Sequence, residues 1–478
     1  MHALRQWAAS SLCFIAWSAN AQGGAQTYEP APIGGDFDSV VANYVAEGLR
    51  SNLALQGQHL EVERAALSLA EARARFYPQL SFEARYTRAD GGREIDVPLG
   101  TALNPVYSTL NDLLVAQGQP ARFPQIADTS IPLLRQEEQE TKVTFRQPLY
   151  APAIPAAVRA QRALLDASSF NRMAIARALR RDITVAYVDW LKARSSVEIV
   201  AASEALLQEN LRVNESLFGN GKITEDLVLR AKAEMLDVEQ QKRDAVNNAS
   251  QARSYFNFLL NRQLLSNIEV TSPPTNTAAT DSALEQLWST AIDRRPEVAQ
   301  VEQLRRASEE QVRIARQQKW PTLSFGIDAG TQGEEYRFGD GYNYGTASLI
   351  FTWRIFDGGG DTARVHQARA AEKQLVLRQE EIAQQIRLEV QQSYDRLTTA
   401  RDSLATAAAR ADAARAAFRI ASRKRDEGVI SQVEFIDARS ALTSAELNHN
   451  LTRYSVLARR AELEYATSTG EIPLDPGV

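Results

Sequence analysis

Apolar residues recur along most of this chain with the spacing of an α-helix, and four short segments with the spacing of a strand interrupt them. The two longest helical runs, about 157–218 and 362–425, would each extend for roughly 90–100 Å at ~1.5 Å per residue. We therefore predict a protein made mostly of helices, several far longer than the average helix of a globular protein. Shorter runs cover about 38–76, 224–260, 282–319 and the segment from Gly428 to about 466.

Strand spacing is clearest between residues 320 and 361, where two alternating runs flank a loop rich in Gly, Tyr and acidic residues. Leu323, Phe325 and Ile327 share one parity in the first run, which indicates a strand with one apolar face. The first half of the chain has a similar pair of alternating runs, separated by a long connection at 88–140. A short helix is expected within this connection, at about 107–116. The predicted strands are about 78–87, 142–150, 321–330 and 346–355.

The same order of elements occurs twice, with matching residues at matching points. Tyr-Pro-Gln-Leu-Ser-Phe at 77–82 corresponds to Trp-Pro-Thr-Leu-Ser-Phe at 320–325, and Gly-Lys-Ile-Thr at 221–224 corresponds to Gly-Val-Ile-Ser at 428–431. Both matches favour an internal duplication. The predicted division is a signal peptide at 1–21, a first repeat at 22–271, a linker at 272–281 and a second repeat at 282–478, with helical turns near 219–224 and 426–431.

Composition and charge narrow the class of protein. Arg5, the apolar run from 7 to 17 and Ala-Asn-Ala at 19–21 form the pattern of a secretory signal, which contains the only cysteine, Cys13. No segment reaches the ~18 consecutive apolar residues that a membrane-spanning helix needs. The formal net charge is −5, with acidic and basic residues interspersed, which argues against a nucleic-acid partner.

Four strands of this length could cross a bilayer at a tilt, but four strands cannot close a barrel. An open sheet edge in lipid would leave backbone groups unpaired, so membrane-spanning strands would require further copies of the chain. Aromatic residues at the strand ends fit two interfacial girdles, although they would equally cap the core of a soluble sheet. The aromatic candidates are Tyr77, Tyr150, Trp320 and Phe356 at the helix-side ends, and Tyr86 and Tyr344 at the loop side.

In these features the chain resembles the TolC family of outer-membrane efflux proteins. The resemblance rests on the paired Pro-x-Leu-Ser-Phe strand entries at Pro78 and Pro321, the strand-to-helix passage at 353–359, and the turns that begin at Gly221 and Gly428. It implies a homotrimer in the outer membrane of a Gram-negative bacterium, whose long helices form a periplasmic tunnel. The expected fold class is mostly α with a small β part: a TolC-like trimeric α/β barrel with four transmembrane strands per chain and an internal two-fold repeat.

The resemblance also implies a function. Such a protein is the exit duct of a tripartite efflux system and works with a periplasmic adaptor protein and an inner-membrane transporter, surrounded by outer-membrane lipid. The outer-membrane component of type I protein secretion shares this architecture and stays open as an alternative. A secreted helical scaffold or adhesin is the alternative from another class, and it would be found in the aqueous fraction without detergent.

The two turns between the long helices are the candidate contact sites. In the family such turns meet the adaptor and close the tunnel, although Gly at a turn is first a backbone device that tolerates positive φ. Glu434 and Asp437 share a helix face, and three copies could form a carboxylate ring that favours cations, or they could be solvated on an outer face. Asp226 and Arg425 are candidates to replace the polar partners of the family's best-known gate. The tip candidates are Gly221, Lys222, Ile223, Thr224, Gly428, Val429, Ile430 and Ser431.

The sequence contains no pattern that predicts catalysis. Apart from His2 in the expected signal, the histidines His59, His366 and His449 are too widely separated to suggest a metal or catalytic site. Gly-Gly-Gly at 358–360 lacks the Lys-Ser/Thr of a phosphate loop and is interpreted as a turn. No enzymatic activity, cofactor or metal is expected.

Overall fold

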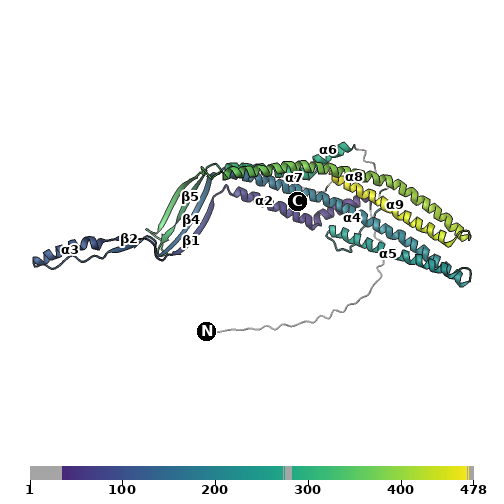
Figure 1. Ribbon diagram of the computed structural model, residues 1–478, viewed down its shortest axis with the longest axis horizontal. Helices are drawn as coiled ribbons and strands as arrows, with labels where there is room; N and C mark the ends of the chain where they lie inside the picture. The colour runs from purple at the N-terminus through teal and green to yellow at the C-terminus, as the bar shows by residue number, and fades with distance from the viewer. Residues whose placement is uncertain (1–34, 273, 275–282, 471, 473–478) are drawn as a thin grey trace, which may run out of the picture.

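The computed structural model describes residues 35–272, 274, 283–470 and 472. In this part of the chain a bundle of long helices forms one end, a four-stranded sheet follows, and an extension containing a helix forms the other end (Figure 1). The expected signal peptide and most of the expected linker lie outside the described residues. Within the described residues, no helix is long and apolar enough to cross a membrane.

Two consecutive helices precede the sheet strands in each half of the chain, where the sequence predicted one run. Asn52 interrupts the first run because its backbone is extended, with ψ 121°, and its side chain accepts a hydrogen bond from the Leu55 backbone N–H at 3.1 Å. Arg295 interrupts the second run because it precedes Pro296, whose ring disfavours helical geometry at the residue before it. The helices are α1 (Phe37–Ser51), α2 (Leu53–Ala74), α6 (Leu284–Arg294) and α7 (Pro296–Gln317).

Two long helical hairpins form most of the bundle. The outgoing helices, α4 (Ala153–Gly219) and α8 (Gly360–Asp426), contain 67 residues each, or about 100 Å at 1.5 Å per residue. The return helices are α5 (Glu225–Leu259) and α9 (Gln432–Thr467). α4 packs against α2, α5, α7 and α9, so it is the central helix of the chain. Ala156, Ala160 and Ala163 are buried along it at helical spacing, which lets neighbouring helices approach closely.

The largest hydrophobic cluster lies where α1, α4, α5 and α9 meet. Tyr187 of α4 is completely buried there, with its ring centroid 5.5 Å from that of Tyr44 and 5.6 Å from that of Phe256. Its hydroxyl donates a hydrogen bond to the backbone carbonyl of Glu269 at 2.9 Å, so the one polar atom of the ring is satisfied inside the core. This cluster joins the first helix of the chain to the last.

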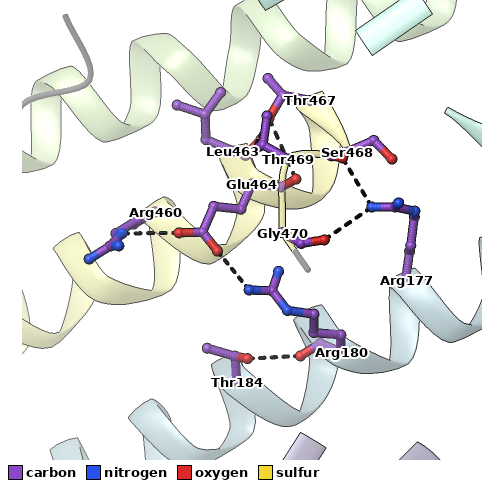
Figure 2. A network of polar contacts seen from close by, with 10 residues as sticks. All are labelled: Arg177, Arg180, Thr184, Arg460, Leu463, Glu464, Thr467, Ser468, Thr469 and Gly470. Atoms are coloured by element: carbon purple, nitrogen blue, oxygen red, sulfur yellow. Dashed lines mark hydrogen bonds and ion pairs between the residues drawn. The ribbon is translucent and has the colours of Figure 1, made fainter. Parts of the chain in front are cut away.

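Arginines of α4 hold the end of α9 (Figure 2). Arg177 donates to the backbone carbonyls of Ser468 at 3.1 Å and Gly470 at 3.3 Å, and Arg180 donates to the Glu464 carboxylate at 3.1 Å. Cations suit this position because the last carbonyls of a helix lack intrahelical partners. These bonds join the final helix of the second half to the central helix of the first.

The four-stranded sheet is antiparallel, in the order β1-β4-β5-β6. Its register gathers the apolar side chains on one face: Phe145 lies opposite Leu80 on one side and opposite Ile327 on the other. Leu80 and Phe82 are 73% and 71% exposed, so a single chain leaves this face uncovered. Among the described residues, the outer edges of β1 and β6 have no strand partner. The strands are β1 (Gln79–Arg88), β4 (Glu137–Tyr150), β5 (Thr322–Gly333) and β6 (Asn343–Thr352).

The connection between β1 and β4 contains more regular structure than the sequence predicted. β2 (Glu94–Val97) pairs with β3 (Thr129–Pro132), and α3 (Leu99–Ala116) lies between them. The sequence predicted a shorter helix, at about 107–116. A proline inside a helix removes a hydrogen bond. The helix nevertheless includes Pro105, and its first turn is capped from outside, since the Asp128 carboxylate accepts a hydrogen bond from the Thr101 backbone N–H at 2.8 Å.

Candidate functional site

The two turns that the sequence singles out lie at the same end of the bundle, far from the sheet (Figure 1). Gly221 and Gly428 adopt left-handed φ values of 67° and 72°, which favour glycine over any residue with a Cβ. After the first glycine, the Lys222 backbone N–H donates to the Leu217 carbonyl at 2.9 Å, and the equivalent bond of the second turn measures 2.8 Å. This is the Schellman arrangement that ends a helix. Both glycines therefore serve the backbone of the turn.

The residues that follow each glycine present a mixed surface. Lys222, Thr224, Val429 and Ser431 are exposed, whereas Ile223 and Ile430 are half-buried. Each turn thus offers a polar group beside an apolar one, and a protein partner could bind both. These are the tip candidates that the sequence named, and they lie on the surface in the two matching turns.

Glu434 has a structural partner at the start of α9. Its carboxylate accepts a hydrogen bond from the Ser431 backbone N–H at 2.9 Å, while the Ser431 hydroxyl accepts one from the Glu434 backbone N–H at 3.3 Å. This reciprocal pair is a capping box. Asp437 is exposed one turn further along α9. The matching turn lacks the device, because the Thr224 side chain makes no capping bond at the start of α5.

Arg425 points from the end of α8 toward the first hairpin. Its guanidinium donates to the Asn210 side-chain oxygen of α4 at 2.8 Å and lies 4.0 Å from the ring centroid of Phe435 in α9. Asp226, the other predicted gate residue, is exposed in the first turn of α5. The structure therefore makes Arg425 a bridge between the two hairpins of one chain and does not bring it to Asp226.

Arg439 is a buried charge near the tips that the sequence analysis missed. It is 7% exposed, donates to the Ser203 hydroxyl of α4 at 3.3 Å and lies 5.4 Å from the ring centroid of Phe418. Burial lowers the pKa of Arg439, and only the charge of Glu446 opposes this shift. A signal was present in the sequence, since Arg439 falls on the same helical face as the buried residues Phe435 and Leu442.

The polar face of the sheet carries a connected set of side chains. Arg85 of β1 forms an ion pair with Glu140 of β4 at 2.8 Å, and the Tyr344 hydroxyl of β6 donates to the same carboxylate at 3.0 Å. Thr144 of β4 donates to Asp328 of β5 at 2.6 Å. These contacts cross all four strands, so this face suits water while the opposite face suits an apolar environment.

Five of the six aromatic candidates at the strand ends are exposed. Tyr344 differs, because it has the opposite parity to Leu349 and Phe351 and is half-buried on the polar face. The exposed five are Tyr77, Tyr86, Tyr150, Trp320 and Phe356.

Metal-ligating side chains do not gather in this structure: among the described residues, no three His, Cys, Asp or Glu side chains are placed to hold an ion together.

Known proteins share this architecture. Residues 287–469 match the model of the family described as outer membrane efflux protein. The chain is also 27% identical to Protein CyaE of Bordetella pertussis over a segment that covers 37% of this chain and 37% of that relative. The matched segment is thus little more than a third of the relative's length.

Solved structures match over nearly the whole chain. The CmeC outer membrane channel of Campylobacter jejuni is 17% identical with a TM-score of 0.72, over 98% of this chain and 96% of CmeC. A membrane protein from Pseudomonas aeruginosa is 18% identical with a TM-score of 0.72, over 91% of each chain. The open state of the MtrE outer membrane channel of Neisseria gonorrhoeae is 16% identical with a TM-score of 0.68, over 90% of this chain and 88% of MtrE.

The chain therefore has the fold of TolC-like outer-membrane channels, mostly helical with a small sheet, which confirms this part of the predicted fold class. Its second half carries the sequence pattern of the outer membrane efflux protein family. This match and the shared fold agree with the resemblance drawn from the sequence.

Proposed function

We propose that this protein is the exit duct of a tripartite efflux system, which passes substrates from an inner-membrane transporter and a periplasmic adaptor to the exterior. The observation that carries the proposal is that two different exposed surfaces lie far apart along the molecule. A sheet with an uncovered apolar face lies beyond one end of the helical bundle, and two exposed helical turns lie at the bundle's other end (Figure 1). The match to a family described by efflux supports this function over protein secretion.

The duct is a homotrimer in this proposal. Each unpaired backbone group in lipid costs several kcal/mol, so the free edges of β1 and β6 require strand partners. Three copies of the sheet, with β1 of one chain against β6 of the next, give a closed barrel above the minimum of about eight strands. The exposed apolar face would then contact lipid, and the face with Arg85 and Glu140 would line a water-filled lumen. The exposed aromatic side chains would mark the membrane interfaces.

The helical turns are the proposed adaptor contacts. Lys222 and Thr224 in one turn, with Val429 and Ser431 in the other, are exposed and lie beside chain reversals that backbone hydrogen bonds hold. Asp437 and Glu434 are the proposed carboxylates of the periplasmic aperture. We further propose that the two halves of the chain, 22–271 and 282–478, are repeats joined by the linker 272–281.

Fractionation and transport assays test the duct. The full chain should require detergent for extraction from outer membranes and should have the mass of a trimer in native mass spectrometry. Deleting its gene should increase retention of a fluorescent efflux substrate, and the wild-type gene should restore export. A monomer in the aqueous fraction would support the scaffold alternative, whereas normal dye export with a lost secreted protein would support type I secretion.

Charge-neutral variants test the aperture. Glu434→Gln removes a charge but keeps the capping box, because Gln serves at the same position, and Asp437→Asn leaves the helix start untouched. In single-channel recordings the double variant should lose cation selectivity while keeping its trimeric mass. Glu462→Gln on α9, far from the turn and paired with Arg459, is the matched control. Unchanged selectivity in the double variant would remove Glu434 and Asp437 from the aperture.

A disulfide or photo-crosslink from position 429 tests whether the second turn contacts the adaptor. Val429 is 67% exposed beside the second glycine, so a photoreactive residue there should capture the adaptor in cells. The same probe at Leu229 serves as the comparison. Leu229 is 57% exposed and lies in α5, beyond the residues of the first turn. Equal capture at both positions would argue against the turn as the contact.

A further inference from the structure

The helix α3, in the extension beyond the sheet, has an uncovered apolar seam. Five large apolar residues are exposed along it, at alternating spacings of four and three residues. That spacing places them at the a and d positions of a heptad repeat, the pattern by which helices associate with one another. The seam consists of Leu99, Leu103, Val106, Leu110 and Leu113.

A different face of α3 is already occupied by the chain's own segment 119–128. The Asn104 side chain donates to the Ile126 backbone carbonyl and accepts from its N–H, both at 2.8 Å. Asn111 does the same with the backbone of Phe123, at 2.7 and 3.0 Å. A Cβ at Gly100 would lie 2.2 Å from the Ile126 carbonyl oxygen, so the segment lies directly on the helix.

These contacts fix which face of α3 remains free. Tyr107 of the helix and Phe123 of the segment pack against each other with tilted rings, whose centroids are 5.3 Å apart. The segment is therefore held away from the seam, and among the described residues no other element packs on it. Single apolar residues are common on protein surfaces, but five in one continuous row indicate an interaction surface.

We propose that the seams of α3 from the three protomers pack against one another and form a helical bundle beyond the outer end of the barrel. This inference rests on the trimer of the proposed function. β1 leads directly into the extension, so three copies of the sheet in one barrel would start their extensions from the same rim, one from each protomer. Leu at both a positions with Val106 at the central d position disfavours a two-stranded bundle.

The composition of α3 separates this occupant from a lipid surface. Helices that lie on membranes carry Lys and Arg on their polar face. α3 has neither, since Asp112 is its one charged residue. Its other face also bonds to protein backbone instead of facing water. A neutral seam is complementary to copies of itself, because no like charges meet across it.

Cysteine crosslinking of the full-length protein tests the bundle. The one native cysteine, Cys13, lies in the expected signal, so an introduced thiol would be the only one in the mature chain. Val106→Cys is placed on the seam, and Val115→Cys is its control, because Val115 is similarly exposed (61% against 54%) but lies nearly opposite at ~100° per residue. In outer membranes, mild oxidation or a short bismaleimide should give covalent dimers of Val106→Cys at least fivefold more than of Val115→Cys.

Two outcomes would overturn the inference without affecting the duct. Trimers by native mass spectrometry with equal crosslinking at both positions would show that the seams do not meet. A fluorophore on Val106→Cys that is quenched by spin-labelled lipid, with no crosslinking, would assign the seam to the membrane. Failure to obtain trimers at all would instead contradict the proposed function.

Discussion

Arg295 offers the sharpest test of how the described parts of the bundle hold together. Its side chain is 6% exposed, at the break between α6 and α7. It donates to both carboxylate oxygens of Glu297, at 3.2 and 2.6 Å, and to Glu389 of α8. Its guanidinium also lies 4.9 Å from the ring centroid of Tyr465 in α9. Burial alone would lower the pKa of Arg295, but Glu297 and Glu389 raise it above its ordinary value, so the charge is retained.

Arg295→Met keeps the length of the aliphatic stem and removes the guanidinium. Removing one partner of a buried ion pair costs about 3–5 kcal/mol, since the other charge stays behind in a poorly solvated place. Glu389 is 37% exposed and will be partly hydrated, so we expect the lower end, about 3 kcal/mol. The control Arg212→Met breaks a pair with Glu209 in which both side chains are mostly exposed, so it should move the unfolding midpoint much less than Arg295→Met does.

Urea unfolding of the detergent-solubilised full chain, followed by far-ultraviolet circular dichroism, measures both variants. The two should unfold with similar slopes, so that the midpoints report the free energy of unfolding. A loss for Arg295→Met no larger than that for Arg212→Met would refute the reasoning from burial.

The pH dependence supplies an independent check. Burial alone would raise the pKa of Glu297, but Arg295 lowers it below the ordinary value of 4.5. A carboxyl with a lowered pKa contributes stability that is present above its ordinary value and is lost as the pH falls through the folded-state value. Without Arg295, the charged Glu297 carboxylate stays buried without its main cation, and protonation removes this unfavourable charge. The difference in stability between wild type and Arg295→Met should therefore shrink between pH 7 and pH 4, and a constant difference would contradict the assignment.

Three further predictions concern the turns and helices. Gly428→Ala should destabilise the protein by about 1 kcal/mol, because φ is left-handed at this position. Gly57→Ala should stabilise it by about 0.5–1 kcal/mol, because Gly57 lies inside a helix with open space around it. Urea midpoints of the two variants that move in the same direction would contradict this prediction. Ser431→Ala should cost about 1 kcal/mol and speed hydrogen exchange in the first turn of α9, and unchanged exchange there would argue against the cap. Arg425→Ala should free the second turn from α4 and raise single-channel conductance, while Lys424→Ala should not; equal conductances would show that the bridge does not restrain the turn.

Periodicity predicts the long helices and the strands because both depend on local repetition of apolar residues. The alternation of Leu323, Phe325 and Ile327 defines one face of β5, and the register places that face in line with Phe145 of β4. The glycines of both turns were also recognisable, since a helix C-terminus that needs a left-handed residue favours Gly.

Features that depend on distant partners were not predictable in this way. α3 begins at Leu99 because Asp128, far along the chain, caps its first turn, and no local pattern contains that contact. The break at Asn52 similarly uses an amide that also donates to the Leu259 carbonyl at 2.9 Å. The capping box is different, because Ser-x-x-Glu at 431–434 is a sequence signature that would have assigned Glu434 a structural partner in advance.

The surfaces left open by one chain favour the proposed duct over a soluble scaffold. A scaffold would cover the apolar sheet face with its own elements, yet Leu80, Phe82 and Leu349 remain mostly exposed and, among the described residues, no helix packs on them. Covering that face would still leave the edges of β1 and β6 free, a hazard that soluble proteins avoid with short or charged edge strands. Pairing between chains satisfies the edges, and lipid covers the face. The proposed trimer in a membrane would satisfy both requirements, which is why we expect detergent to be needed for extraction and the trimer to persist once extracted.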